Sequence, residues 1–409
     1  MIKICIVAEY MFCGGSEKSL LAFLNCLDRK LFDITLLFMK KKGDLLGLLP
    51  NDINIEEIVF PEDEEYDLLY GRKEAIKCAM KKGDIQSVIK KSVRAIKMTH
   101  EAHSATERRV WYYRNIEDKI AEYPQKFDVV IDYMGYGLFN TFYAAKKVQG
   151  KIKFTWVHFE PEIAMPDFYA FRQILNEYNY IMCVSKSGLE QVCDMMPELS
   201  SKCRVFHNIV NEVEIKRLAE EDEIKKVLNK INILSVGRLD PQKGYDILIK
   251  VISRLYKEGY PVALRIIGEG WQRTELENMI NDDIYAAESV ELLGQRINPY
   301  PYFKTCDIYI QPSRHEGYGI AVAEARMFDK PILVTDFAGA REQLTHGVTG
   351  IITNCSEEAI YQSLKKMIED EKLRQSLSEN LQKEHGRKPP QLKWFMSTVL
   401  KEVSYLDQK

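Results

Sequence analysis

The sequence predicts an α/β protein with two doubly wound domains, each built on a parallel sheet that helices cover on both faces. Short apolar runs alternate with segments of helical periodicity along most of the chain, and this alternation favours parallel sheets. It occurs in two series, which a polar stretch at residues 211–230 separates. A chain of 409 residues is also too long for one hydrophobic core and fits two domains of ordinary size.

Composition and charge narrow the class of protein. With 46% apolar and 29% charged residues, the chain is typical of globular rather than disordered proteins. The net charge of −3 gives no strong field for nucleic acid, which we exclude as a partner. No apolar run reaches the length of a membrane span. The opening segment MIKICIVAEY lacks a small-residue cleavage site, so we interpret it as a strand rather than a signal peptide.

The chain has nine cysteines, and none of them forms a CxxC motif or a Cys/His cluster with zinc spacing. Several lie in apolar runs, as Cys5 and Cys183 do, where a buried free thiol is the ordinary interpretation. We therefore expect reduced thiols, a cytoplasmic location and no metal site.

The first series predicts a domain at residues 1–208. A glycine-containing loop follows the first strand, and a helical segment with Leu20, Leu24 and Leu27 comes next. A second strand then completes a βαβ unit. The strands expected in this domain are residues 3–8, 33–39, 128–134, 153–159 and 180–185.

Residues 62–126 interrupt the alternation and predict a helical insertion in the first domain. From Gly71 to Asp128 the chain has 14 Lys/Arg against 8 Asp/Glu, and it carries the aromatic run VWYYRN. One interpretation is a set of solvated helical faces. The other is a basic, aromatic surface that docks on an anionic membrane or an acidic acceptor.

The second series predicts a domain at residues 209–387, with the boundary near Asn208–Arg217. Its first long helix, YDILIKVISRLYKEG, ends at Gly259. The segment RKPPQ breaks the helical C-terminal region, and one last amphipathic helix is expected within residues 388–409. The strands expected in this domain are residues 231–237, 262–268, 289–294, 307–313, 331–335 and 350–353.

The loops that follow strands carry the functional predictions, because ligands of open parallel sheets bind at the carboxyl ends of strands. The loop GRLDPQKG follows the strand INILSV and places Arg238 and Lys243 five residues apart. Two cations there can clamp a diphosphate, the arginine as a planar fork and the lysine as a point charge. The alternative is a surface loop with two ordinary cations.

Two motifs of the first domain are less specific. After the first strand, CGGSEKS places Gly14 and Gly15 where the backbone can approach a ligand, ahead of a helix expected from near Ser16. The N–H groups of that helix can bind an anion, although a serine-capped turn is the ordinary alternative. His158, in TWVHFEPE, lies at the end of a strand. A histidine there can contact a reacting group, but a structural role is more common.

The most informative stretch is EGYGIAVAEA, in which seven residues separate Glu316 from Glu324. Gly317 and Gly319 leave backbone N–H groups free at the start of a helix expected from about Gly319 to Phe328, and such a helix end binds phosphate. If the helix begins near Gly317, Glu324 lies about two turns into it. Since a carboxylate can accept two hydroxyl hydrogen bonds, the spacing suits a nucleotide sugar with one glutamate near each polyol.

In this order and at these spacings, the motifs GRLDPQKG, GEG, PSRHEGYGIAVAEA, KPILVTDFAGAREQL and HGVTG resemble those of the retaining glycosyltransferases of family four, which have the GT-B fold. The resemblance covers the second domain almost completely. Over the first domain it rests on GGSEKSLLAFL, TWVHFE and FHNIVN, and it does not extend to the insertion. It implies two Rossmann-like domains facing across a cleft, with the C-terminal helix returning to the first domain.

The resemblance also implies roles for residues of this chain. Arg238 and Lys243 would stabilise the leaving diphosphate, Glu324 would hold the nucleotide ribose, and the donor sugar would lie near Glu316 and His158. No metal ion or cofactor is implied. The catalytic residues implied are Arg238, Lys243, Glu316 and His158. The donor-binding residues implied are Gly14, Gly15, Gly237, Arg296, Gly317, Tyr318, Gly319, Ile320 and Glu324.

The expected function is retaining transfer of a sugar from a nucleoside diphosphate sugar, with UDP favoured over GDP, to a glycan acceptor. The basic insertion favours a lipid-linked or cell-surface glycan at the inner face of a membrane, with peripheral membrane contact. One alternative is a nucleotide-sugar epimerase of the same fold, which needs no acceptor surface. Another is a non-catalytic sugar-nucleotide-binding protein, which would have lost Arg238, Lys243 or Glu324. A nicotinamide dehydrogenase is disfavoured because no GxGxxG opens the first βαβ unit.

Overall fold

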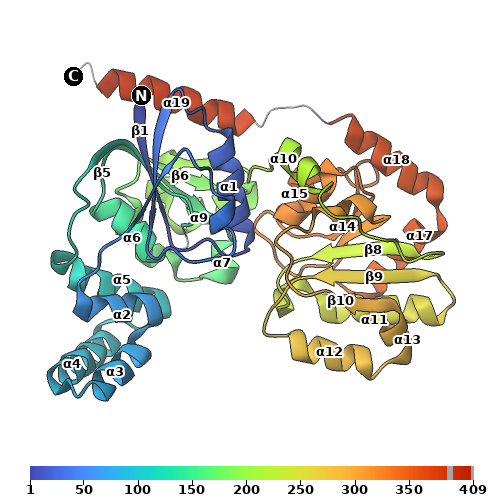
Figure 1. Ribbon diagram of the computed structural model, residues 1–409, viewed down its shortest axis with the longest axis horizontal. Coiled ribbons are helices and arrows are strands. Elements are labelled where there is room, and N and C mark those ends of the chain that lie inside the picture. Colours follow the sequence, from blue (N-terminus) through green and yellow to red (C-terminus); the bar gives the residue numbers. More distant parts are fainter. Residues whose placement is uncertain (136, 385–389, 407–409) are drawn as a thin grey trace. The chain divides into compact units, whose positions relative to one another are not determined.

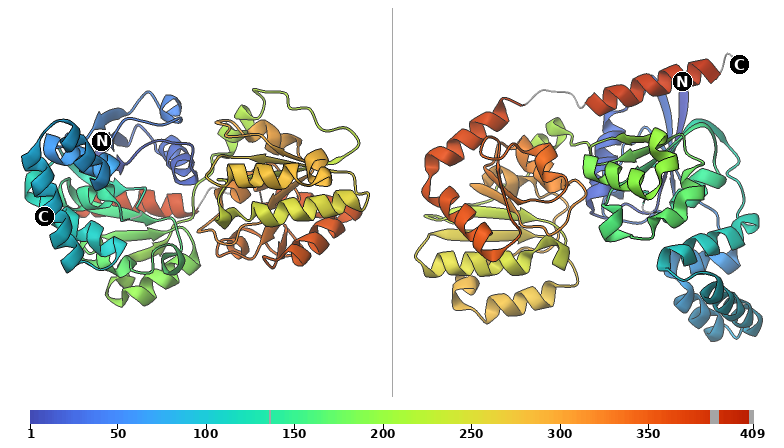
Figure 2. Two further views of the ribbon diagram at one scale, coloured as in Figure 1. Left: turned by 90° about the horizontal axis from the view of Figure 1, so that it is seen from below. Right: turned by 180° about the vertical axis from the view of Figure 1, so that it is seen from behind.

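The computed structural model describes residues 1–135, 137–384 and 390–406. The chain divides into two compact units, Met1–His207 with Pro390–Lys409 (unit 1) and Asn208–Pro389 (unit 2). In each unit, helices lie on both faces of one parallel sheet (Figure 1 and Figure 2). The boundary expected at residues 387–388 lies outside the described residues. Within the described ranges, no helix combines the length and apolar character needed to cross a membrane.

Unit 1 holds a seven-stranded parallel sheet in the order β3-β2-β1-β4-β5-β6-β7. Ile4 of β1 pairs with Ile34 of β2 on one side and with Val129 of β4 on the other. Strand order reverses between β1 and β4, as the doubly wound pattern requires. The strands are β1 (Ile2–Ala8), β2 (Phe32–Phe38), β3 (Asn54–Glu57), β4 (Lys126–Asp132), β5 (Gln149–Val157), β6 (Tyr180–Cys183) and β7 (Cys203–Val205).

Both edge strands of this sheet, β3 and β7, lie outside the segments predicted as strands. β3 is the run NIEE, whose residues are exposed or half-buried, so no apolar run marks it. β7 has only three residues, CRV, which is too short to show a period. An edge strand pairs on one side only and is often short or polar, so the apolar pattern did not reveal either one.

The helices of unit 1 outside the insertion pack on its sheet, and the C-terminal helix is one of them. The ring of Phe395, which is fully buried, lies 5.3 Å from the ring of Phe23 and 5.2 Å from that of Phe154. Aromatic pairs at these distances stabilise a core beyond the area they bury. These helices are α1 (Gly15–Cys26), α6 (Phe139–Lys146), α7 (Pro161–Ala164), α8 (Arg172–Leu175), α9 (Lys186–Met195) and α19 (Pro390–Leu406).

The insertion between β3 and β4 is helical, and a buried carboxylate joins its parts. Glu64 accepts hydrogen bonds from Arg94 at 2.5 and 2.7 Å, from Tyr112 at 3.0 Å and from Lys119. Burial alone would raise the pKa of Glu64, but these partners lower it to about 2. The helices are α2 (Glu62–Tyr70), α3 (Arg72–Lys81), α4 (Ile85–Glu101) and α5 (Ala105–Ile116).

Unit 2 holds a six-stranded parallel sheet in the order β10-β9-β8-β11-β12-β13. Strand order reverses between β8 and β11, where Ile233 pairs with Ile308. Every strand of this sheet coincides with a predicted one to within two residues. The strands are β8 (Ile231–Val236), β9 (Val262–Ile267), β10 (Val290–Leu292), β11 (Ile308–Gln311), β12 (Ile332–Thr335) and β13 (Ile351–Thr353).

Helix α15 agrees with the helix predicted from about Gly319 to Phe328, but the position of Glu324 within it was counted from Gly317. The helix begins at Ile320, after the cap residue Gly319. Glu324 therefore lies about one turn into the helix, rather than two. The helices of unit 2 are α10 (Glu212–Leu218), α11 (Tyr245–Lys257), α12 (Arg273–Asn281), α13 (Ile284–Ser289), α14 (Tyr300–Thr305), α15 (Ile320–Met327), α16 (Ala340–Gln343), α17 (Glu357–Glu369) and α18 (Glu371–Gln382).

Candidate functional site

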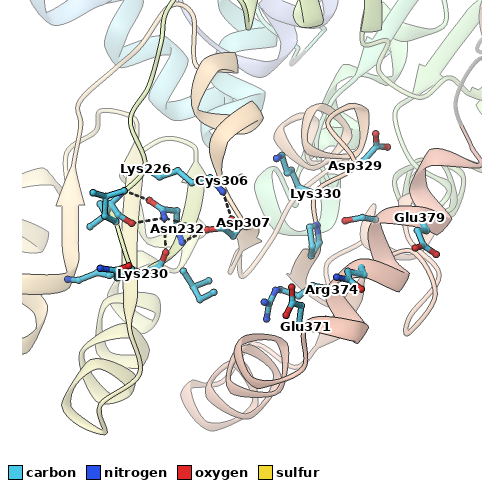
Figure 3. Close-up of a pocket in the computed structure, with 17 residues that line it drawn as sticks. Lys226, Lys230, Asn232, Cys306, Asp307, Asp329, Lys330, Glu371, Arg374 and Glu379 are labelled. Carbon is cyan, nitrogen blue, oxygen red and sulfur yellow. Dashed lines mark hydrogen bonds and ion pairs between the residues drawn. The ribbon is translucent and has the colours of Figure 1, made fainter.

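Unit 2 has a pocket of about 650 Å³ at the amino ends of its strands (Figure 3). Residues 226–232, 306–307 and 329–331 line it, and these segments precede β8, β11 and β12. Its charges also neutralise one another, since Lys226 Nζ lies 2.5 Å from Asp307 Oδ1. Ligands of open α/β sheets bind beyond the opposite, carboxyl ends of the strands, so we take the site to be there.

Two loops of unit 2 carry the motifs: the first follows β8 (residues 237–244) and the second follows β11 (residues 312–319). They lie beside each other because β8 and β11 are neighbours at the reversal of strand order. Arg314 joins these loops. Its guanidinium donates to Pro241 O at 2.6 Å and to both carboxylate oxygens of Asp246 at 2.8 Å, and it lowers the pKa of Asp246. Gln242 adds a bond from its Nε2 to His315 O at 2.8 Å. The loops therefore form one bonded platform.

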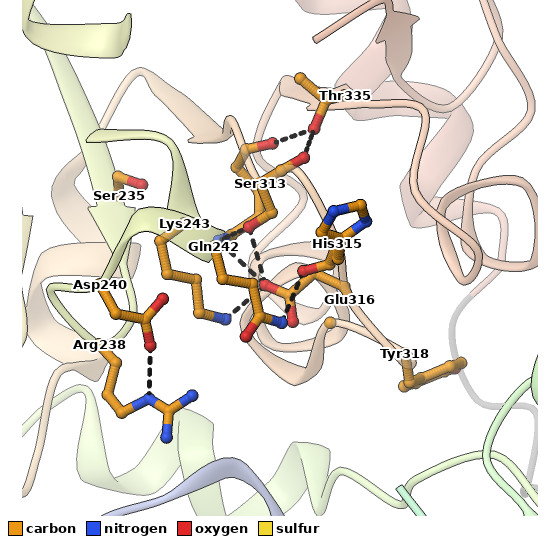
Figure 4. A network of polar contacts seen from close by, with 12 residues as sticks. Ser235, Arg238, Asp240, Gln242, Lys243, Ser313, His315, Glu316, Tyr318 and Thr335 are labelled. Atoms are coloured by element: carbon orange, nitrogen blue, oxygen red, sulfur yellow. Dashed lines mark hydrogen bonds and ion pairs between the residues drawn. The ribbon is translucent and has the colours of Figure 1, made fainter. Parts of the chain in front are cut away.

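Lys243 and Glu316 face each other on this platform (Figure 4). Lys243 Nζ is ion-paired with Glu316 Oε1. The same oxygen accepts hydrogen bonds from Ser313 Oγ at 2.9 Å and from Gln311 Nε2 at 3.4 Å. Glu316 is only 8% exposed. Because several donors converge on Oε1, the carboxylate is held in one orientation with a cation beside it.

Arg238 lies on the same loop as Lys243 but closer to solvent. Its side chain is 72% exposed, and its Nε donates to Asp240 Oδ2 at 2.9 Å. The other oxygen, Asp240 Oδ1, is buried and has no hydrogen-bond partner among the described residues. A buried polar atom in that state is typical of a site that a ligand or water completes. Arg238 is thus a largely exposed cation on the loop that also carries Lys243.

Glycines allow the loops of neighbouring strands to approach closely. Gly244 has a φ of 71°, and a Cβ there would lie 2.2 Å from Pro312 O. A Cβ on Gly268 would lie 1.9 Å from the carbonyl oxygen of Gly237. Gly268 N also donates to Gly294 O at 3.0 Å. The loops that follow β8, β9 and β10 therefore lie side by side along the carboxyl edge of the sheet.

Helix α15 points its N-terminus at the end of the second motif loop. Gly319, with a φ of 82°, caps the helix, and Ile320 begins it. Gly317, in the loop just before, is half-buried. The N–H groups of a first helical turn favour anions. Glu324 is 3% exposed, and its Oε1 accepts a hydrogen bond from Tyr300 Oη at 2.9 Å.

Two of the predicted donor residues lie farther from the ion pair. Arg296 is exposed on the loop after β10, two strands away from β8. Tyr318 is buried and lies apart from Lys243 and Glu316 in Figure 4. Burial raises the pKa of Tyr318 to about 12. Its side chain therefore belongs to the packed interior.

In unit 1, His158 follows β5 directly and is tied to the neighbouring strand. Its Nε2 donates to Tyr133 O at 2.7 Å, and the Tyr133 hydroxyl lies 2.7 Å from Ser19 Oγ of α1. Tyr133 follows β4, which adjoins β1 at the reversal of strand order. The histidine is thus positioned at the carboxyl edge of this sheet, where a ligand site of this fold class lies.

A buried aspartate supports this edge and was not predicted from the sequence. Asp132 accepts hydrogen bonds from Asn140 Nδ2 at 2.6 Å, Thr155 Oγ1 at 2.7 Å and Gly135 N at 3.2 Å. Burial raises the pKa of Asp132 to about 6, and these donors oppose the rise. Asp132 directly precedes Tyr133 in the chain. Its hydrogen bonds therefore help to fix the backbone at Tyr133, whose carbonyl oxygen accepts the hydrogen bond from His158. An aspartate at the end of the apolar run VVI was the available signal.

The glycine loop of unit 1 is less suited to phosphate than its sequence suggests. Gly14 caps α1 and Gly15 begins it. The Glu17 carboxylate occupies this helix end, where it accepts a hydrogen bond from Ser16 Oγ at 2.8 Å. A Cβ on Gly14 would lie 2.3 Å from Glu17 Oε2. A carboxylate already stabilises the N-terminus of α1, and this weakens the prediction that an anion binds here.

Sequence patterns also missed Arg314 and Tyr300, which organise the site of unit 2. Both bond to residues far along the chain, so spacing alone could not pair them with their partners. Among the described parts of the chain, no group of three or more His, Cys, Asp or Glu side chains is placed to hold a metal ion.

Part of the chain, including the loops of this site, is similar in sequence to known proteins. The family model "Glycosyl transferases group 1" matches residues 216–384, which lie within unit 2. The chain is 34% identical over 194 residues to N-acetylgalactosamine-N,N'-diacetylbacillosaminyl-diphospho-undecaprenol 4-alpha-N-acetylgalactosaminyltransferase of Campylobacter jejuni, covering 47% of this chain and 51% of that protein. It is 28% identical to the capsular polysaccharide biosynthesis glycosyltransferase CapM of Staphylococcus aureus, covering 45% and 47%. The chain thus spans about half the length of these curated relatives.

Solved structures show the same fold over nearly the whole chain. Anabaena Alr3699/HepE in complex with UDP and glucose matches with a TM-score of 0.69 and 17% identity, covering 98% of this chain and 100% of that one. A mutant of S. aureus TarM matches with a TM-score of 0.66 and 12% identity, covering 99% of each. With its two parallel sheets and loop platform, this is a protein of the GT-B class. Within this fold, residues 216–384 of unit 2 match the model of the glycosyl transferases group 1 family.

Proposed function

We propose that the chain is a retaining glycosyltransferase that moves a sugar from a nucleoside diphosphate sugar to a glycan acceptor. The observation that carries the proposal is the Lys243–Glu316 pair on the loops after β8 and β11, at the reversal of strand order in unit 2. A cation beside an oriented carboxylate, next to a helix N-terminus, offers complementary groups to a diphosphate and a sugar.

The proposed chemistry follows from charge. The leaving nucleoside diphosphate gains negative charge as its bond to the anomeric carbon breaks, and Lys243, Arg238 and the N-terminus of α15 stabilise that charge. The sugar becomes oxocarbenium-like. We propose that the acceptor attacks from the same face, assisted by the leaving phosphate, and that His158 contacts the donor sugar.

Glu316 binds the donor sugar in this scheme and does not attack it. Its Oε1 is held by Lys243, Ser313 and Gln311, and a carboxylate so engaged is a weak nucleophile. Oε2 is then the oxygen that accepts hydrogen bonds from sugar hydroxyls. A trapped glycosyl adduct on Glu316 would contradict this scheme.

The proposed donor is a UDP-sugar. Structural neighbours of the same fold are described in complex with UDP, among them HepE with UDP and glucose. In this chain the nucleotide would meet Glu324 through its ribose and the loop carrying Arg296 through its base. The neighbours' ligands support the choice of base by analogy of fold.

The proposed acceptor is a glycan carried on a lipid diphosphate. The relative from Campylobacter jejuni is named for an acceptor of the diphospho-undecaprenol type, and CapM is named for capsular polysaccharide biosynthesis. Such an acceptor places the reaction at the cytoplasmic face of a membrane.

The test combines donor binding with stereochemistry. The thermal shift of the full chain would be measured with UDP-, GDP- and ADP-sugars, beside the variants Lys243→Ala and Glu324→Ala. We expect a UDP-sugar to stabilise the wild type and both variants to lose that shift. NMR of the released sugar would then show a retained anomeric configuration. A folded protein that no nucleotide sugar stabilises, or an inverted product, would overturn the proposal.

A further inference from the structure

One helix of the insertion carries an apolar stripe that the described residues of its unit leave exposed. Along α4, the side chains of Ile85, Ile89, Val93 and Ile96 are 71%, 57%, 58% and 72% exposed. Their spacings of four, four and three residues place them within about 80° of one another around the helix axis. Four large aliphatic side chains at this exposure form a continuous surface rather than scattered exposed residues.

This stripe is not the core face of α4, because the helix packs through a different one. Met98 is 4% exposed, Lys91 is ion-paired with the buried Asp67 of α2, and Arg94 bonds Glu64. These residues lie on the side of the helix opposite the stripe, at the same period of 3.6 residues. The packing of α4 in unit 1 is therefore complete without the four aliphatic side chains.

Charge indicates what covers the stripe. Residues 71–102, which hold α3 and α4, contain nine Lys/Arg against three Asp/Glu, a local net charge of +6 in a chain whose net charge is −3. Lys90 and Lys97 lie along one flank of the stripe, and Lys81 and Lys82 are exposed in the turn before it. Met80, 64% exposed, adds apolar surface at that turn. Cations that border an apolar stripe suit a surface with anionic headgroups above hydrocarbon.

We propose that the α3–α4 hairpin docks unit 1 on an anionic membrane surface, with Ile85, Ile89, Val93 and Ile96 entering the headgroup region. Both helices form the end of unit 1 farthest from its sheet (Figure 1, Figure 2), so the stripe reaches a flat surface without hindrance from the rest of the unit. A second copy of this chain is a poor occupant, because two such surfaces would bring like charges together.

The proposal is tested with the full chain and lipid vesicles, without any sugar donor. Co-sedimentation would compare vesicles of phosphatidylcholine alone with vesicles of equal parts phosphatidylcholine and phosphatidylglycerol. We expect binding to the anionic vesicles, weakened by added salt. The double variant Ile89→Glu/Val93→Glu should bind at least tenfold more weakly. The variants Lys81→Ala and Lys82→Ala should each lose about fivefold.

A matched control separates docking from net charge. Val213→Glu/Leu228→Glu adds the same two charges at aliphatic positions of unit 2 that are 81% and 84% exposed, and it should bind like the wild type. Hydrogen exchange of residues 85–97 should slow when anionic vesicles are added. Circular dichroism spectra and melting temperatures that match those of the wild type, measured without donor, would show that the variants are folded.

Three results would overturn the proposal. The first is wild-type protein that stays in solution with anionic vesicles. The second is equal loss of binding in the control double variant. The third is a dimer, seen by analytical ultracentrifugation, that Ile89→Glu/Val93→Glu dissociates, because the stripe would then be an interface between two copies. Since the assay contains no donor, its failure would leave the proposed transferase activity untouched.

Discussion

Glu316 of unit 2 and Glu64 of unit 1 are both buried carboxylates held by cations, yet their surroundings differ. Glu64 is 1% exposed and joins helices of the insertion through Arg94 and Lys119. Glu316 lies on the loop after β11, near the loop that carries Arg238, whose side chain is 72% exposed. A buried ion pair alone is therefore a weak sign of function. The feature that indicates function is the position of the Lys243–Glu316 pair at the reversal of strand order.

The largest effect is expected for Lys243→Ala. Removing this cation takes away stabilisation of the leaving diphosphate, so we expect kcat for sugar transfer to fall by about 10²–10³. The melting temperature should also fall, because the Lys243 side chain is only 16% exposed and its removal leaves Glu316 without its cation. The kinetics are therefore compared well below the melting temperature of both proteins. Steady-state kinetics with a saturating donor would measure the loss. Lys250→Ala, an exposed lysine of α11, is the matched control and should keep full activity. An equal loss in both variants would mean that local stability, not chemistry, is affected.

Glu64→Gln should act on stability instead. The substitution leaves Arg94 and Lys119 without their buried counter-charge, and we expect the free energy of unfolding of unit 1 to fall by about 3 kcal/mol. Denaturant unfolding would measure it. Glu74→Gln, at an exposed pair with Lys77, is the control and should change stability by less than about 1 kcal/mol. Donor-induced thermal shift should survive in both variants.

The difference in stability between the wild type and Glu64→Gln should depend on pH, because folding lowers the pKa of Glu64. Its pKa falls from 4.5 to about 2 on folding, because the hydrogen bonds outweigh burial. The ionised carboxylate therefore stabilises the fold fully above about pH 4.5, and this contribution is lost as the pH falls toward 2. The gap in stability between wild type and Glu64→Gln should shrink over that range. A gap that stays constant from pH 6 to pH 3 would contradict the role given to Glu64.

Arg314→Lys tests whether the two motif loops act as one platform. Lysine keeps the charge but loses the fork that bonds Asp246 and Pro241. We expect kcat/KM to fall about tenfold, since charge-assisted hydrogen bonds of this kind contribute about 1.5–3 kcal/mol. Arg341→Lys is the control, because Arg341 makes a similar fork to Asp336 but is 67% exposed. If Arg314→Lys and Arg341→Lys lower kcat/KM equally, the bonds of Arg314 between the two loops do not position the site residues.

The sequence could predict the central strands because parallel strands buried on both faces are apolar throughout. It could not predict β3 and β7, which lie at edges and carry little apolar sequence. The sequence could also predict that the loops carrying Lys243 and Glu316 lie at the carboxyl edge of the sheet, because each loop directly follows a predicted strand. It could not predict the contacts that these loops make. Arg314 bonds partners 73 and 68 positions away, and no local pattern signals a pairing at that range.

The smallest effect is expected for Tyr300→Phe. Tyr300 Oη donates to Glu324 Oε1 at 2.9 Å in a buried setting, and this bond orients the carboxylate proposed to hold the nucleotide ribose. Losing one hydrogen bond should weaken donor binding by about 1 kcal/mol, or about fivefold. The contact exists before and during the reaction, so KM for the donor should rise while kcat stays unchanged.

Tyr302→Phe, on the same helix α14, is the matched control and should leave KM unaltered. Initial rates across a range of donor concentrations would separate KM from kcat for both variants. A fall in kcat with KM unchanged would place Glu324 at the reacting sugar rather than at the ribose. No change in either constant would mean that the orientation of Glu324 is set by its helix alone. The platform of unit 2 would then depend on Arg314 and not on the aromatic residues of α14.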